Sequence, residues 1–110
     1  MDRHGWHDRF EEAGSIDEMV AAVRQYAGVV AGASPRLPTG CRADRIQDDD
    51  DIDSLTWRLA DLSREHRDDA ALQQAFAHFL HASLRIARMR RDLTRQVVAG
   101  APFRASRQMA

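Results

Sequence analysis

Residues 69–99 read DAALQQAFAHFLHASLRIARMRRDLTRQVVA, and this stretch decides the fold. Its apolar side chains recur every three or four positions, which places them on one broad stripe of an α-helix. The stripe consists of Leu72, Phe76, Phe79, Leu80, Ile86, Ala87, Leu93, Val97 and Val98. Gly100 and Pro102 predict that the helix ends near residue 99. At about 1.5 Å per residue, such a helix is about 45 Å long.

Two further amphipathic helices precede the long one. The first, at about 15–31, opens with the capping-box pair Ser15 and Glu18 and carries a single apolar stripe. The second, at about 51–66, has Asp51 as a candidate N-cap and a narrow apolar seam with spacings of three and four. This second helix is only about 24 Å long. Antiparallel packing against the long helix would therefore leave the C-terminal part of the long helix uncovered.

We therefore expect an all-α fold, a small helical bundle. Its three main helices lie at about 15–31, 51–66 and 69–99. The centre of the core is predicted to consist of Leu55, Leu59, Leu62, Phe76, Phe79 and Ile86. All six positions fall on the apolar faces that the two last helices turn toward each other.

The remaining segments complete a single helical domain over 1–110, since 110 residues is the size of one domain. A short helix is expected near the N-terminus, where Trp6 and Phe10 lie four apart and share a face. A long central loop covers 32–50, and 101–110 is expected to be a flexible tail.

Composition narrows the class of protein. The chain is 44% hydrophobic and 30% charged, which is typical of a globular domain. It contains no apolar run long enough to span a membrane, and its first ten residues lack the apolar segment of a secretory signal. Cys41 is the single cysteine, so no internal disulfide can form. We expect a cytoplasmic protein without a membrane partner.

The small net charge of −1 hides two oppositely charged parts. Residues 84–110 contain seven arginines and one acid, a balance of +6, whereas residues 1–83 contain nine arginines and sixteen acids, a balance of −7. Parts of opposite charge can pair within one chain or between two chains, or they can present a basic end to an acidic partner.

Arg90 lies inside the apolar stripe of the long helix, between Ile86 and Leu93. A buried guanidinium without a partner is costly. Three arrangements avoid that cost: the stripe is exposed at this point, an acid such as those of the run 48–51 meets Arg90, or its stem covers apolar surface while its head reaches water. We expect the third.

These features favour a small protein–protein interaction module, such as a regulator, an adaptor or an accessory protein. The uncovered end of the long helix would form a homodimer or bind a protein partner. The predicted partner-binding residues are Ile86, Arg90, Leu93 and Val97.

An alternative function is nucleic-acid binding through the basic face of the same helix. Arg85, Arg88, Arg91 and Arg95 share that face, and guanidinium groups bind phosphates well. No helix-turn-helix signature accompanies them, and the whole chain is slightly acidic, so a solvated charged face is the simpler interpretation.

A second alternative is a small-ligand or metal-binding bundle. His78 and His81 have a spacing that allows two ligands on one metal, but no nearby acid or cysteine completes the set, so we expect both to face solvent. The aspartates at 48–51 lack the glycine and glutamate positions of a calcium loop. Cys41 has no assignable histidine partner and is expected to be a small buried apolar residue. We therefore predict no cofactor, no metal and no enzymatic activity.

Overall fold

The computed structural model describes the backbone of residues 3–109 and the side chains of residues 5–97. This part of the chain is all-α and contains no strand. Its helices are α1 (Arg3–Glu12), α2 (Ile16–Val30), α3 (Asp49–Glu65) and α4 (Ala70–Met109), with two short 3-10 turns, η1 (Thr39–Cys41) and η2 (Ala43–Arg45). The all-α prediction and the order of one short and three longer helices are confirmed.

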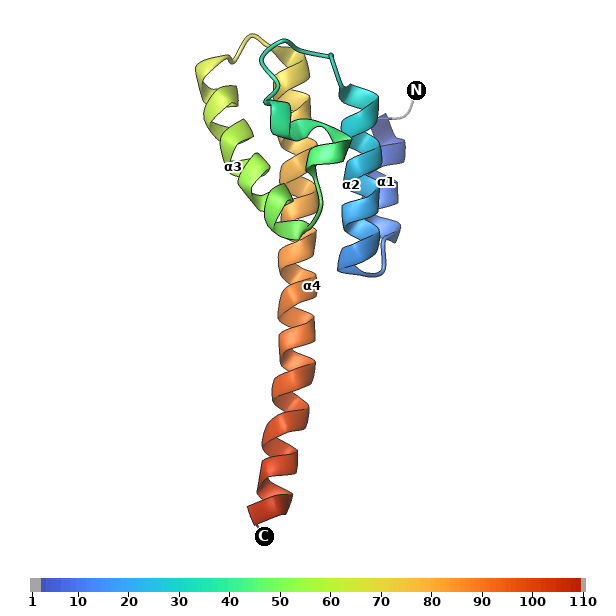
Figure 1. The fold of residues 1–110 in the computed structure, drawn as a ribbon, viewed down its shortest axis with the longest axis vertical. Coiled ribbons are helices and arrows are strands. Elements are labelled where there is room, and N and C mark those ends of the chain that lie inside the picture. The colour runs from blue at the N-terminus through green and yellow to red at the C-terminus, as the bar shows by residue number, and fades with distance from the viewer. Residues whose placement is uncertain (1–2, 110) are drawn as a thin grey trace.

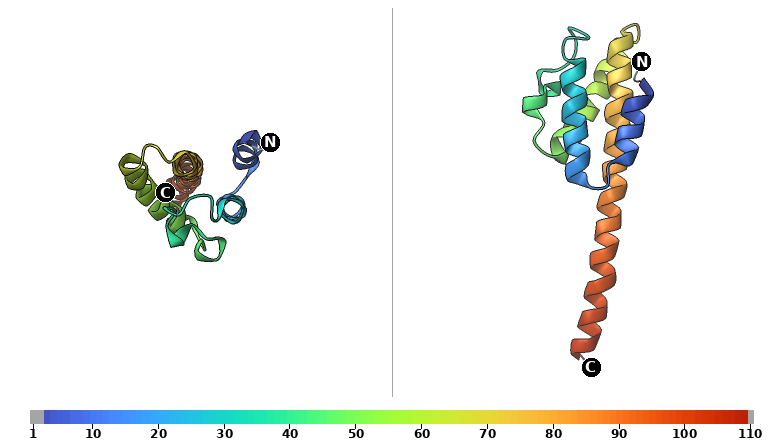
Figure 2. Two further views of the ribbon diagram at one scale, coloured as in Figure 1. Left: turned by 90° about the horizontal axis from the view of Figure 1, so that it is seen from above. Right: turned by 90° about the vertical axis from the view of Figure 1, so that its right-hand side faces the viewer.

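The helices form a bundle from which one end of α4 projects. Figure 1 shows α3 on one side of the first half of α4, with α1 and α2 on the other side. Figure 2 gives the same arrangement from above and from the side. The second half of α4 continues alone, which makes the molecule elongated, with extents of 63 × 28 × 22 Å. The uncovered length predicted for this helix is therefore present.

Helix α4 begins at a well-defined cap. The Leu72 amide donates to Asp69 Oδ1 at 3.0 Å, and the same carboxylate accepts from Ser34 Oγ at 2.6 Å and from Arg36 at 3.2 Å. These bonds lower the pKa of Asp69, the Ser34 bond contributing most. Asp69 thus starts the long helix and fastens the central loop to it.

The predicted end of this helix is wrong. Instead of stopping near residue 99, α4 continues through Gly100 and Pro102 to Met109. The flexibility expected for 101–110 stays a prediction. Both residue types weaken a helix interior, by about 1 kcal/mol for glycine and about 3 kcal/mol for proline, which lacks an amide donor and crowds the carbonyl four residues earlier, but these are energetic costs and neither forbids a helix. Residue 110 lies outside the described part of the chain.

The core lies where α1 and α2 on one side and α3 on the other pack against the first half of α4. Of the six residues predicted at its centre, Leu55, Leu59, Phe79 and Ile86 are buried, and Leu62 and Phe76 are partly buried against them. Thr56 Oγ1 donates to the Phe79 carbonyl at 3.2 Å, which shows how closely α3 approaches α4. Exposed Trp57, which departs from the seam of α3, plays no part in the core.

Helices α1 and α2 cover the opposite side of α4. The capping box of α2 is confirmed, since the Glu18 amide donates to Ser15 Oγ at 3.1 Å. Phe10 is fully buried, and Trp6 meets the edge of the Tyr26 ring with centroids 5.4 Å apart. The short N-terminal helix is therefore held by aromatic side chains on one of its faces.

The segment from 31 to 48 is an ordered crossover that packs on the bundle. Gly32 begins it with a positive φ of 82°, a conformation that glycine adopts without strain. Ile46 and Cys41 are buried, and Arg24 Nε donates to the Ala43 carbonyl at 3.3 Å. The loop spans the distance between the ends of α2 and α3, which explains its length.

Candidate functional site

A cluster of charges marks the point where α4 leaves the bundle. Arg90 Nε donates to Asp49 Oδ2 at 2.8 Å, its Nη2 bonds the same oxygen, and its Nη1 donates to Asp53 Oδ2 at 2.9 Å. Asp53 Oδ1 also accepts from Ser83 Oγ at 2.7 Å. Arg90 is thus held to α3 by its charged head, so the alternative in which an acid meets it is confirmed, while its side chain remains 36% exposed, so it keeps some contact with water as expected.

The aspartates of this cluster are positioned by the way in which α3 begins. Asp48 is the N-cap, in place of the expected Asp51, because its Oδ1 accepts from the Asp51 amide at 3.1 Å. Asp51 in turn accepts from the Gln47 amide at 2.8 Å. Asp49 and Asp53 are four apart and face α4 together. Their hydrogen bonds raise the pKa of Arg90, the bond to Asp49 contributing most.

Removing this cation is expected to destabilise the protein moderately. Arg90→Met keeps the apolar stem but leaves Asp49 and Asp53 facing each other, and we expect a loss of about 1–2 kcal/mol in the free energy of unfolding, discounted because the pair is partly solvent-exposed. Urea denaturation measures it. Arg88→Met, on the exposed side of the same helix, is expected to change stability by less than about 0.5 kcal/mol. Equal losses in the two variants would contradict the assignment.

Beyond Arg90 lies the projecting segment, which we define as residues 91–109 of α4. The side chains of 91–97 are all exposed, including Leu93 at 54% and Val97 at 68%. Ile86, by contrast, is completely buried inside the chain. Of the four predicted partner-binding residues, only Leu93 and Val97 therefore remain free, because Ile86 belongs to the core and Arg90 is held by α3.

The four arginines of the predicted nucleic-acid face also differ in exposure. Arg88, Arg91 and Arg95 are exposed. Arg85 is partly buried, and its Nη2 donates to the carbonyls of Glu11 and Ala13 at 2.9 and 2.7 Å. These carbonyls are at the C-terminal end of α1, where a cation is favoured. Arg85 is a capping residue for α1 and is not available to a phosphate.

The two histidines do not face solvent, contrary to expectation, because α1 and α2 pack over them. The Tyr26 hydroxyl lies 3.1 Å from His78 Nδ1. His81 lies against α1, where its ring is 4.5 Å from the ring of His7 and its Nε2 is 2.8 Å from Glu11 Oε2. Burial, and then the charge of His7, lower the pKa of His81. The helical wheel of α4 alone gave no sign of these neighbours.

The other candidate residues are used structurally. Burial raises the pKa of the Cys41 thiol to about 11, so the thiol is protonated and a poor nucleophile at neutral pH. Within the aspartate run, Asp48 and Asp51 cap α3 and Asp49 holds Arg90. Asp50 is 89% exposed, with Arg90 Nη2 3.6 Å from its Oδ1. The run therefore serves the start of α3 and its junction with α4.

Against known protein families, functionally curated proteins and solved structures, the chain finds no match. Within its described residues, none of the helices combines the length and the apolar character that crossing a membrane requires.

Proposed function

We propose that this protein is a small helical protein–protein interaction module, and that the projecting segment of α4 pairs with the same segment of a second copy in an antiparallel homodimer. One observation carries the proposal: a helix of 40 residues is covered by its own chain over only its first half. An isolated helix of this remaining length is marginally stable in water. The same segment of a second copy would supply the apolar contacts that this part of α4 lacks in a single chain.

The exposed apolar residues support pairing along the helix. Leu93 and Val97 are four apart, so they share one face, which continues the direction of buried Ile86. Met89 lies on the flank of this face and is partly buried. Two such faces packed lengthwise would bury Leu93 and Val97 of both copies, in the manner of two-helix contacts elsewhere in proteins.

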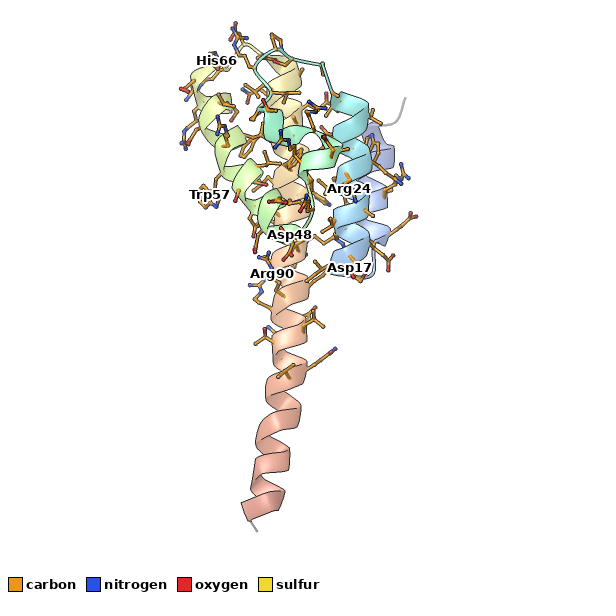
Figure 3. The ribbon with its side chains drawn as sticks, in the orientation of Figure 1. Asp17, Arg24, Asp48, Trp57, His66 and Arg90 are labelled. Atoms are coloured by element: carbon orange, nitrogen blue, oxygen red, sulfur yellow. The ribbon has the colours of Figure 1, made fainter. Side chains whose placement is uncertain are left out.

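Charge selects the antiparallel orientation. The acidic base is defined as exposed Asp17 and Glu18 at the start of α2 and Asp48 and Asp50 at the start of α3, the ends of both helices that lie where α4 emerges (Figure 3). Figure 3 shows Asp17, Asp48 and Arg90 at this end of the bundle. Residues 91–110 contain four arginines and one acid in the sequence. An antiparallel pair brings the basic end of each copy toward the acidic base of the other, whereas a parallel pair brings like charges together.

The test is the oligomeric state of matched variants. The wild type is expected to have twice the 12.4 kDa mass of the chain in light scattering. Leu93→Gln combined with Val97→Gln removes the apolar face and keeps helix propensity. The double substitution removes four apolar side chains from the dimer interface, two from each copy. At about 1 kcal/mol for each side chain, Kd is expected to rise roughly a thousand-fold.

Val29→Gln is the control, since Val29 is 67% exposed and lies on α2, away from the projecting segment. It is expected to leave the mass unchanged. A wild type that stays monomeric up to high micromolar concentration would overturn the homodimer. If such a monomer instead retained duplex DNA at low salt and lost it as salt rises, the function would be nucleic-acid binding through Arg88, Arg91 and Arg95.

A cytoplasmic location is part of the same proposal. The single thiol, Cys41, is buried and protonated at neutral pH, as suits a protein that keeps its cysteine reduced.

A further inference from the structure

We infer that His7, Glu11 and His81 form a binding site for a divalent transition metal of the Zn²⁺ class, which ties α1 to α4. One ligand atom from each of these three residues lies within 4.8 Å of the other two. The site is separate from the projecting segment, and its ligands come from α1 and α4, where Phe10 of α1 contacts His78 and His81. The inference does not depend on the homodimer.

Two of the ligands are paired by helix geometry. His7 and Glu11 are four apart on α1, so both side chains lie on the face that meets α4. His81 comes from the facing helix, with its imidazole stacked on the Phe10 ring at 6.0 Å and 24°. A pair of ligands at i and i+4 on one helix, completed by a ligand from a neighbour, is a common way to build a metal site in a helical bundle.

The distances suit a small metal ion. A tetrahedral Zn²⁺ with bonds of about 2.0–2.1 Å holds its ligand atoms roughly 3.3 Å apart. Glu11 Oε2 and His81 Nε2 are already 2.8 Å apart, and the remaining separations do not exceed 4.8 Å. His7 is exposed, so its side chain has the freedom to move toward the other two ligands. Two imidazoles and one carboxylate favour Zn²⁺ over Mg²⁺ or Ca²⁺, which prefer oxygen ligands.

The contact between His81 and Glu11 leaves room for a shared ion. The His81 Nε2 atom is buried and lies 2.8 Å from Glu11 Oε2, but the angle of this contact is poor for a hydrogen bond. With the ring proton on Nε2 the imidazole donates to the carboxylate, whereas with the proton on Nδ1 the lone pair of Nε2 faces the carboxylate oxygen and is free to bind a cation. A cation between the two atoms would use both lone pairs.

Two cations lie near the site and limit its affinity. Arg85 Nη1 is 4.0 Å from Glu11 Oε1, and Arg88 is close enough to act on His81. Arg85 is anchored by its bonds to the two carbonyls at the end of α1, and it approaches Oε1 of Glu11, whereas His81 contacts Oε2. Three protein ligands leave the fourth position of the metal open to water.

The test is titration of the full chain with Zn²⁺ by calorimetry, in a buffer without chelators. One Zn²⁺ is expected per chain. His7→Ala and Glu11→Gln, both at exposed positions that leave the core intact, are each expected to weaken binding by about 100-fold or more, since each removes a direct ligand. His66→Ala, at the end of α3, is the control and is expected to bind as the wild type does.

A second readout is thermal stability. Zn²⁺ is expected to raise Tm of the wild type and of His66→Ala, and to leave Tm of His7→Ala and Glu11→Gln unchanged, because binding to the folded state alone stabilises it. Absence of binding at 100-fold molar excess would overturn the inference. So would binding that survives both ligand substitutions. Neither result bears on the homodimer, which is tested by substitutions at Leu93 and Val97.

Discussion

Replacing Phe79 with alanine is expected to lower the free energy of unfolding by about 3–5 kcal/mol. The Phe79 side chain is 1% exposed and lies at the centre of the bundle, with the Tyr26 ring 6.0 Å from its own. Its backbone carbonyl also accepts from Thr56 on α3. A domain of this size is stable by only about 5–15 kcal/mol, so the variant should be close to the limit of folding at 37 °C.

Leu80→Ala is the matched control for this substitution. Leu80 is the next residue of the same helix but is 37% exposed, so its truncation is expected to lose less than about 1 kcal/mol. Urea denaturation followed by far-UV circular dichroism measures both values. Similar losses at the two positions would mean that the side of α4 that carries Phe79 does not face the bundle.

Replacing Phe10 with alanine is expected to have a second large effect, confined at first to α1. Phe10 is fully buried and contacts Tyr26 on α2 and both His78 and His81 on α4. Helix α1 is short and includes Gly5, so it depends on this packing to remain folded. We expect the free energy of unfolding to fall by about 3–5 kcal/mol. If the packing of α1 on the bundle contributes less free energy than this, α1 is expected to detach while the other helices stay folded.

Amide hydrogen exchange distinguishes these two outcomes. Detachment predicts fast exchange in α1 with unchanged protection in α3 and in the first half of α4. Because His7 and Glu11 would leave with α1, binding of Zn²⁺ would be lost as well. Asp8→Ala, on the exposed side of α1, is the control, and the amides of α1 should stay protected from exchange in this variant. Slow exchange of α1 in Phe10→Ala would show that other contacts hold this helix.

The helices were predictable because their signals are local. The capping box of Ser15 and Glu18 and the stripe from Leu72 to Ile86 each involve residues within a few turns of one another, and both are present in the structure. The end of α4 was wrongly predicted because glycine and proline lower helix propensity without preventing a helix. Local sequence therefore predicts that a helix exists more reliably than it predicts the residues at which the helix begins and ends.

The candidate sites were less predictable because they join distant segments. Asp49 and Arg90 are 41 positions apart, and sequence could name the aspartates only as one of three alternatives. Glu11 and His81 are 70 positions apart in the sequence, and nothing in the pattern of α4 indicated that α1 covers it at that point. Only the docking of α1, carried by Phe10, brings the metal ligands together.

The central claim is that the projecting segment of α4 is covered by a second copy of the chain. Amide hydrogen exchange over 91–97, measured at protein concentrations above and below the dissociation constant of the dimer, tests this most directly. We predict protection of these amides in the concentrated sample and its loss on dilution, while the amides of 72–86 stay protected in both. Fast exchange of 91–97 at every concentration, with 72–86 protected, would contradict the claim.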